Sequence, residues 1–200
     1  MSTTETPTRL RLFCAIELPA EVRARAQQHL VQLRESAPHV KASWERAEKM
    51  HITIKFFGDV EAERVALLTE ATARAASAVS SFALTLAGAG VFPPGGNPRV
   101  LWLGVQDANG RLAQLQQRLE DECAAAGFAR DPRPFHAHVT LARLRAANAA
   151  ARRLARYHAE LGFAPAPFPV SELILMRSEL APGGSQYMPL ARHRLSGGTP

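Results

Sequence analysis

The chain of 200 residues is long enough to bury a hydrophobic core without disulfide or metal support. Its formal net charge of +6 favours an anionic partner such as nucleic acid, although an arginine-rich composition is also typical of biased genomic base composition. The N-terminus lacks a signal-peptide pattern and no apolar run reaches bilayer length, so we expect a cytoplasmic protein without a membrane segment, with Cys14 and Cys123 reduced.

In the first half of the chain, period-two alternation predicts strands and helical spacing of apolar residues predicts helices. The predicted elements are a strand over 9–18, a helix over 20–37, a strand over 50–57, a helix over 60–79 and a strand over 82–90. Gly58 follows the second strand and is predicted to be its turn residue.

The second half repeats this alternation of strands and helices after a Pro-Gly-rich loop. The predicted elements are a loop over 91–98, a strand over 99–105, a helix over 109–126, a strand over 135–143, a helix over 147–161, a linker over 164–169, a strand over 170–180, a turn over 181–185 and an edge strand over 186–195. The strand over 99–105 is apolar on both faces, which predicts a central position in a sheet. Pro189 places the last strand at an edge.

The order of strand, helix and histidine-bearing strand occurs twice, first over 9–57 and again over 99–142. This repetition indicates two structurally similar lobes. We therefore expect one bilobal domain over 9–195, with tails at 1–8 and 196–200 that have no fixed structure.

Each histidine-bearing strand contains the pattern His, apolar, Thr, apolar. The first copy starts at His51 and includes Thr53, and the second starts at His138 and includes Thr140. In a strand, residues two apart share one face at a spacing of roughly 6.5–7 Å. If the two lobes pack about a pseudo-twofold axis, all four polar side chains can face one cleft.

Two imidazoles and two hydroxyls suit phosphodiester chemistry. An imidazole titrates near ~6.5, so one ring can accept a proton from water while the other protonates a leaving alkoxide. Threonine hydroxyls can donate to the nonbridging oxygens of a phosphate. This chemistry needs no metal and no cofactor. A single His-x-Thr pattern would be more typical of a cross-strand polar pair, but two copies in similar lobes favour catalysis.

The segments that carry these motifs resemble those of the two-histidine phosphoesterase superfamily, and within it the bacterial and archaeal RNA 2′,3′-cyclic phosphodiesterases, also called 2′-5′ RNA ligases. The resemblance covers almost the whole chain, through "RLFCAIELP", "HITIKFFGDV", "GVFPPGGNPRVLWLGV", "RPFHAHVTLAR" and "LILMRSELAPGGSQY". It implies an α+β fold with two pseudo-symmetric lobes whose antiparallel sheets surround a central cleft.

The resemblance also implies an activity: metal-independent hydrolysis of 2′,3′-cyclic phosphate ends to 2′-phosphates. His51 would be the proton donor, His138 the proton acceptor, and Thr53 and Thr140 would hold the phosphate. The expected partner is an RNA with a 2′,3′-cyclic phosphate end or a nucleoside 2′,3′-cyclic phosphate, bound by a monomer. The family commonly has Phe-Arg-Pro-His before the second motif, whereas His136 stands at the arginine position here.

Four further residues are candidates for substrate binding. Lys55 continues the His-Thr face of the first motif, and a solvated strand-end lysine is the alternative. Arg143 belongs to the family pattern. It lies three residues after Thr140, so in a regular strand it points away from the cleft, and it reaches the cleft only if the strand ends or bends. Phe13 could stack on a base or pack beneath a helix, and Tyr187 could line the cleft.

Two other functions use the same residues. ATP-independent 2′-5′ ligation would run the reaction in reverse, with a 5′-hydroxyl in place of water. A non-catalytic RNA-binding module would keep the cleft without turnover, an alternative against which the two intact motifs argue.

Overall fold

The computed structural model of the chain describes residues 8–182 and 184–197. Most of the two predicted tails therefore lies outside the described residues, as does residue 183 in the predicted turn. Within the predicted C-terminal tail, Ser196 forms an isolated β-bridge with Ser80. Every helix in the described part of the chain is too short or too polar to cross a bilayer.

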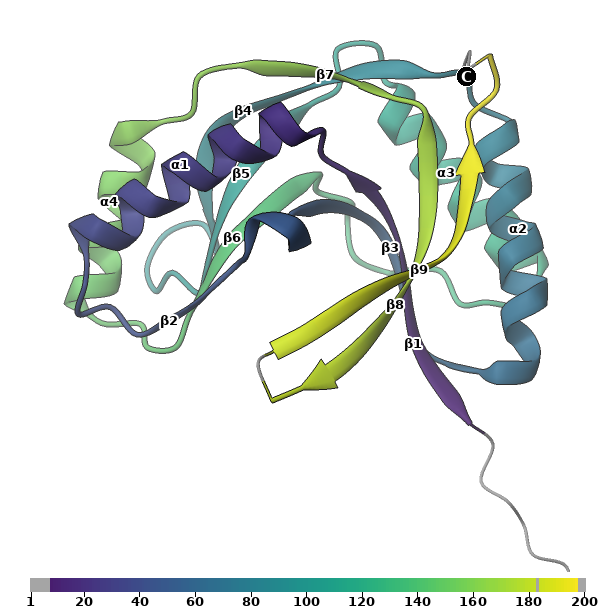
Figure 1. Cartoon of the computed structure of the whole chain (residues 1–200), viewed down its shortest axis with the longest axis horizontal. Coiled ribbons are helices and arrows are strands. Elements are labelled where there is room, and N and C mark those ends of the chain that lie inside the picture. Colours follow the sequence, from purple (N-terminus) through teal and green to yellow (C-terminus); the bar gives the residue numbers. More distant parts are fainter. Residues whose placement is uncertain (1–7, 183, 198–200) are drawn as a thin grey trace, which may run out of the picture.

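The helices and strands alternate largely as predicted (Figure 1). The strands are β1 (Arg9–Glu17), β2 (Ala42–Trp44), β3 (His51–Glu61), β4 (Phe82–Phe92), β5 (Val100–Gln106), β6 (His138–Leu144), β7 (Ala166–Val170), β8 (Glu172–Ala181) and β9 (Gly184–Arg194). The α-helices are α1 (Ala20–Ser36), α2 (Val65–Ser77), α3 (Arg111–Ala125) and α4 (Ala149–Leu161), and short 3-10 turns cover Ala47–Lys49 and Ala62–Arg64.

All nine strands belong to one curled antiparallel sheet in the order β7-β4-β5-β6-β3-β1-β8-β9, with β2 added beside β6. The order has an approximate symmetry, because β3 and β6 lie at its centre and β1 and β5 flank them. The two centre strands share the residue pair Ile52 and Val139. The predicted α+β fold is confirmed, and its two lobes are the halves of this continuous sheet rather than separate sheets.

The helices cover one face of the sheet, and the sheet curls so that its other face is concave (Figure 1). Helices α1 and α4 pack on the half that contains β4 and β7, whereas α2 and α3 pack together on the half that contains β8 and β9. The main hydrophobic core lies beneath these helices. A small second cluster of Phe13, Ala15, Ile174 and Met176 lies apart from it, with Tyr187 packed against it.

The predicted linker over 164–169 is wrong, because residues 166–170 form strand β7. Two prolines, Pro167 and Pro169, suggested a linker, but they are the exposed residues of an alternating strand whose other side chains are buried. Strand β7 is at the edge of the sheet. An edge strand tolerates residues without an N–H group, so the prolines mark the edge rather than a break.

The prediction of Gly58 as a turn residue is also wrong. Strand β3 continues through it to Glu61, and the ladder with β1 shifts register there. Gly58 has φ of 70°, a conformation that glycine adopts without steric cost. It therefore serves a β-bulge inside a long strand.

Candidate active site

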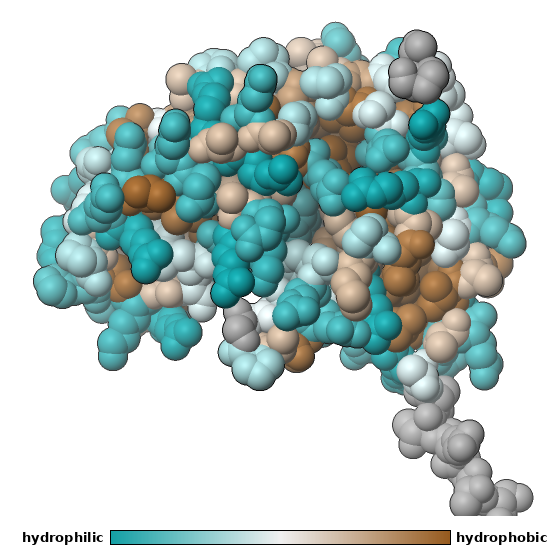
Figure 2. Space-filling view, in the orientation of Figure 1, coloured by the Kyte–Doolittle hydropathy of each residue, from teal (hydrophilic) through white to brown (hydrophobic). Residues whose placement is uncertain are grey.

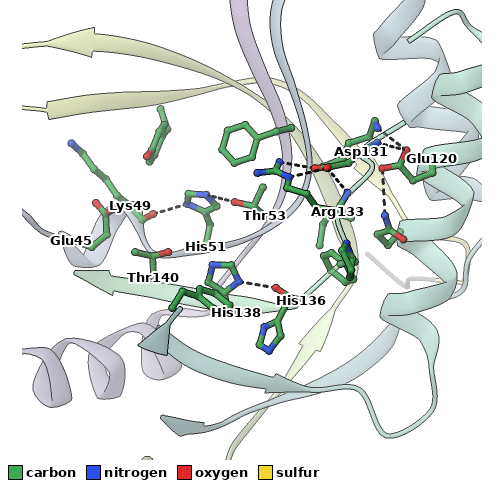
Figure 3. Close-up of a pocket in the computed structure, with 18 of the residues that line it drawn as sticks. Glu45, Lys49, His51, Thr53, Glu120, Asp131, Arg133, His136, His138 and Thr140 are labelled. Atoms are coloured by element: carbon green, nitrogen blue, oxygen red, sulfur yellow. Dashed lines mark hydrogen bonds and ion pairs between the residues drawn. The ribbon is translucent and has the colours of Figure 1, made fainter. Parts of the chain in front are cut away.

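A cavity of about 510 Å³ lies where β3 and β6 meet. Four of its lining residues are those of the two motifs, His51 and Thr53 from β3 and His138 and Thr140 from β6. Figure 3 shows both imidazole rings in this space on neighbouring strands. The sheet thus brings together the four residues that the sequence predicted to carry the chemistry.

The register between the two strands explains how the motifs meet. Ile52 pairs with Val139, and both side chains are fully buried in the main core. In an antiparallel pair with this register, the histidine of each motif lies across from the threonine of the other motif. Because side chains alternate along a strand, all four polar groups lie on the face opposite to the two core residues.

Backbone hydrogen bonds fix the same tautomer in both histidines. Nδ1 of His51 lies 2.7 Å from the carbonyl oxygen of Lys49, and Nδ1 of His138 lies 2.7 Å from that of His136. A carbonyl only accepts, so each neutral ring carries its hydrogen on Nδ1 and has its lone pair on Nε2. Nε2 of His51 is 3.0 Å from Oγ1 of Thr53, which can donate to it.

Both rings are partly buried, His51 more deeply than His138, and their charged neighbours differ in part. Burial lowers the pKa of His51 from its ordinary value of 6.5, while the Glu17 carboxylate acts in the opposite direction. Burial also lowers the pKa of His138, and the positive charges of His136 and Arg143 lower it further. The positive charges of His138 and Arg143 also lower the pKa of His51. Arg143 therefore disfavours the charged form of both rings, and the Glu17 carboxylate favours that of His51.

A β-bulge occurs at the fourth residue of each motif. The β1–β3 ladder skips Ile54, and the β5–β6 ladder skips Leu141. A bulge reverses the side-chain alternation for the residues that follow it. Arg143 is thereby brought to the cavity that it lines, as the resemblance to the phosphoesterases requires and simple alternation did not allow.

The same bulge takes Lys55 out of the His-Thr row that it was predicted to continue, although Lys55 still borders the cavity. Its ladder partner is Cys14, a residue of the main core. The ammonium of Lys55 lies 2.7 Å from the Glu120 carboxylate and 2.9 Å from the carbonyl oxygen of Ala129. The Lys55 side chain is 1% exposed and its ammonium is held by Glu120 and Ala129, so binding an RNA phosphate would have to compete with these contacts.

The prediction that Phe13 offers a stacking surface to a base is contradicted by its burial. Its side chain is 1% exposed, and its ring centroid lies 5.1 Å from that of His51 and 5.2 Å from that of Tyr187. Phe13 therefore packs against the His51 imidazole. The aromatic ring that reaches the cavity is Phe56, which is 45% exposed and comes after the bulge.

Tyr187 lines the cavity from the β8–β9 hairpin, as the sequence suggested. Its ring meets that of His51 edge-on, with centroids 5.2 Å apart. Burial raises the pKa of the Tyr187 phenol, and the Glu45 carboxylate raises it further. The phenol thus remains a neutral hydrogen-bond donor beside the His51 ring.

Several cavity residues were not predicted from the sequence as substrate contacts. They are Glu45, Lys49, Phe92, Gln116, Asp131, Arg133 and Phe135. Glu45 follows β2, and its backbone N–H donates to the carbonyl oxygen of Leu141 at 2.8 Å. Burial raises the pKa of Glu45. The pairing of the short strand β2 with β6 places Glu45 at the cavity. No local sequence pattern predicts that pairing.

His136 stands where the resembling family commonly has arginine, and it also lines the cavity. Its ring lies against Phe92 and Trp102, with centroid separations of 5.1 and 4.9 Å. Its carbonyl oxygen orients His138. In the described part of the chain, no group of three or more His, Cys, Asp or Glu side chains is placed to hold a metal ion.

Comparison with known sequences gives one consistent family. A sequence model described as the 2′-5′ RNA ligase superfamily matches residues 22–181. The chain is 34% identical over 194 residues to the RNA 2′,3′-cyclic phosphodiesterase of Escherichia coli K12, covering 93% of this chain and 97% of that protein. It is 29% identical over 189 residues to the protein of the same name from Thermotoga maritima, covering 94% and 97%.

Solved structures agree with the sequence matches. A crystal structure of a Thermus thermophilus protein superposes with a TM-score of 0.76 at 27% identity, covering 94% of this chain and 99% of that one. E. coli LigT complexed with 3′-AMP superposes with a TM-score of 0.72 at 31% identity, covering 94% and 99%. The curled sheet that carries the cavity therefore belongs to a fold that is already known from solved structures.

Proposed function

The chain belongs to the 2′-5′ RNA ligase superfamily, and we propose that it is an RNA 2′,3′-cyclic phosphodiesterase that hydrolyses cyclic phosphate ends to 2′-phosphates. The observation that carries this function is the pair of histidines in one cavity, each with Nδ1 held by a backbone carbonyl. Both rings are therefore oriented to exchange protons through Nε2. Several curated relatives bear the name of this activity.

In the proposed reaction, Nε2 of His138 takes a proton from water as the water oxygen attacks phosphorus. The bond between phosphorus and the 3′ oxygen breaks, and Nε2 of His51 gives its proton to that oxygen. The products are a 3′-hydroxyl and a 2′-phosphate. One proton enters the protein and one leaves it, so a second exchange with solvent restores the starting protonation.

The charges around the two rings support this division of roles. An acid must carry its proton before the reaction, and Glu17 favours the charged form of His51. A base must be neutral, and His136 disfavours the charged form of His138, while Arg143 disfavours the charged form of both rings. The substrate phosphate would stabilise both imidazolium forms.

The hydroxyls and one guanidinium complete the proposed site. When Nε2 of His51 carries a proton, Oγ1 of Thr53 no longer needs to donate to it and can donate to a nonbridging phosphate oxygen. Thr140 occupies the equivalent place on β6. Arg143 adds a charge-assisted hydrogen bond to the anion as negative charge develops. The 3′-AMP bound in the E. coli LigT structure supports a nucleoside phosphate as the group that fits here.

The decisive experiment is to incubate the purified protein with an RNA that ends in a 2′,3′-cyclic phosphate. We expect a product heavier by one water whose phosphate resists a phosphatase specific for 3′-phosphates. A 3′-phosphate product, or no turnover, contradicts the proposal. Joined RNA formed without ATP would instead identify the reverse 2′-5′ ligation, and RNA binding that survives loss of both histidines would identify a binding module.

We also propose that the protein acts as a monomer. Both histidines, both threonines and Arg143 come from one chain, so the site requires no second copy. Sedimentation at the concentrations used for assays tests this. Activity that appears only at concentrations where a dimer forms would contradict it. The predicted cytoplasmic location stays a prediction.

A further inference from the structure

The cavity has two ends of different electrostatic character. At one end lie Asp131 and Arg133, and Figure 3 shows them on the opposite side of the motifs from Glu45 and Lys49. Arg143 lies toward the Glu45 end, since its strand pairs there with β2. An RNA whose 3′ end occupies the site must leave the cavity on its 5′ side, and the charges at the two ends bear on which way it goes.

At the Asp131 end, three nearby cations already have carboxylate partners. Three ion pairs have N–O separations of 2.7 Å, and they are Lys55 with Glu120, Arg130 with Asp121, and Arg133 with Asp131. These three pairs carry no net charge. Phosphate binding there would have to compete with carboxylates already in place.

At the Arg143 end, cations gather without such partners. We name this group the basic band, and it consists of Lys41, Arg99, Arg143, Arg145 and Arg152. All five residues are exposed. In the part of the chain that the structure describes, none of the five forms an ion pair. Glu45 lies close enough to feel the charge of Arg143, yet no salt bridge joins them.

Backbone and side-chain contacts bring together the segments that carry the band. The N–H of Arg145 donates to the carbonyl oxygen of Lys41 at 2.9 Å, and Arg99 Nη1 lies 3.4 Å from the carbonyl oxygen of Arg145. Arg152 Nη1 donates to Oδ1 of Asn97, two residues before Arg99, at 3.3 Å. This end of the molecule is the lower left of Figure 2, where the surface is mostly hydrophilic.

We propose that the basic band binds the phosphates on the 5′ side of the cyclic end, so that the substrate is an RNA strand and not only its terminal nucleotide. This rests on the proposed function, because it assumes that the cyclic end lies in the cavity. A row of unpaired guanidinium groups beside the site is the chemistry that tracks a single-stranded backbone. At the opposite end of the cavity, the cations that are paired with carboxylates do not provide such a row.

The test compares two substrates, a nucleoside 2′,3′-cyclic phosphate and an oligoribonucleotide of about eight residues with the same end. The variants are Arg99→Gln and Arg145→Gln, singly and combined, because neither side chain lines the cavity. For the oligonucleotide, we expect kcat/KM at low salt to fall about 3–10-fold per substitution, with the salt slope reduced by about 0.7 for each phosphate that is no longer neutralised. For the mononucleotide, which lacks those phosphates, kcat/KM stays within about twofold.

Two matched controls locate the effect. Arg118→Gln removes an exposed arginine from α3 on the other half of the molecule and should leave both substrates unchanged. Arg133→Gln removes a cation at the paired end of the cavity. If Arg133→Gln weakens the oligonucleotide selectively and the band variants do not, the strand leaves by the other end and the proposal is overturned. Equal losses on both substrates in the band variants also overturn it.

A binding measurement separates this proposal from the proposed function. Fluorescence anisotropy of a labelled oligoribonucleotide ending in a 2′-phosphate needs no turnover. Weaker binding in the combined Arg99→Gln and Arg145→Gln variant supports the band even if no hydrolysis is found. Unchanged affinity in that variant overturns the band even if hydrolysis is found.

Discussion

Strands β3 and β6 carry the same motif and the same bulge, yet the residues after the bulge differ. In β3 the next two residues are Lys55 and Phe56, and in β6 they are Ala142 and Arg143. The first residue of each pair is buried and the second is exposed at the cavity, which Lys55 also borders. The shared backbone places two histidines alike, and the residues beyond the bulge make one side aromatic and the other cationic.

This difference bears on how a symmetric pair of motifs can perform an asymmetric reaction. Arg143 disfavours the charged form of both histidines, whereas His136 disfavours a charged His138 and Glu17, from β1, favours a charged His51. The histidine and threonine of the motif are the same on both strands. Their roles are therefore expected to be set by neighbours outside the motifs.

The largest expected effect is the loss of either histidine. His51→Ala and His138→Ala should each lower kcat by about 10²–10⁴-fold, because general acid and general base catalysis are each worth that much. The double variant should be little worse than the worse single variant, since groups that act together are not additive. Steady-state kinetics on a cyclic-phosphate RNA measures this, and near-normal kcat in either single variant contradicts the account.

The next effect concerns stability. Lys55→Met leaves Glu120 buried without its partner, which should lower the free energy of unfolding by about 3–5 kcal/mol. Urea denaturation measures the change. The β3 strand would then resemble β6, where Ala142 occupies the equivalent buried position.

A matched double variant tests the cause of that loss. Lys55→Met combined with Glu120→Leu removes both charges, and most of the stability should return, because well-packed apolar residues often replace a buried ion pair without loss of stability. The kcat of the double variant should be close to normal, since the ammonium of Lys55 does not face the phosphate. A single variant as stable as the wild type would show that the pair is not buried as described.

Arg143→Gln should have a smaller effect, on kcat/KM. Loss of a charge-assisted hydrogen bond to the phosphate costs about 1.5–3 kcal/mol, which is roughly 10–150-fold. Phe56→Leu, the equivalent position on β3, is the control and should change kcat/KM by no more than about fivefold, since only part of an exposed apolar contact is removed. Equal effects at the two positions would contradict the asymmetry.

The smallest effect is a displacement of the pH profile. Burial lowers the pKa of both histidines below 6.5 in the free protein. The kcat/KM profile should be bell-shaped, falling at low pH as His138 becomes charged and at high pH as His51 loses its proton. Its maximum should therefore lie below pH 6.5, whereas bound phosphate raises both pKa values and moves the kcat profile to higher pH. A kcat/KM maximum above pH 6.5 disagrees with this.

The sequence predicted most of the fold because alternation and helical spacing are local signals. Strand β7 was missed because its prolines mimic a linker, and only its place at the sheet edge accommodates them. The short strand β2 was missed because its pairing with β6 is non-local. Because β2 was missed, Glu45, which follows it, was not predicted as a cavity residue.

The four motif residues could be predicted because period-two spacing puts each His and Thr on one face. Lys55 and Arg143 could not be placed correctly, since a bulge after the fourth residue exchanges the two faces and leaves no plain mark in the sequence. Phe13 was predicted to contact the substrate because alternation puts its side chain on the strand face opposite to the main core, and the structure does place it on that face. Its burial comes from Tyr187 and the His51 ring packed against it, contacts between distant segments.

The central claim is that His51 protonates the leaving 3′ oxygen while His138 activates water. The most direct measurement compares both alanine variants on a normal 2′,3′-cyclic phosphate and on one whose 3′ bridging oxygen is sulfur. A thiolate leaves without needing a proton, because thiols are far more acidic than alcohols. The account predicts that the sulfur substrate restores much of the relative rate of His51→Ala and none of that of His138→Ala. Recovery in His138→Ala alone, or equal recovery in both, would contradict it.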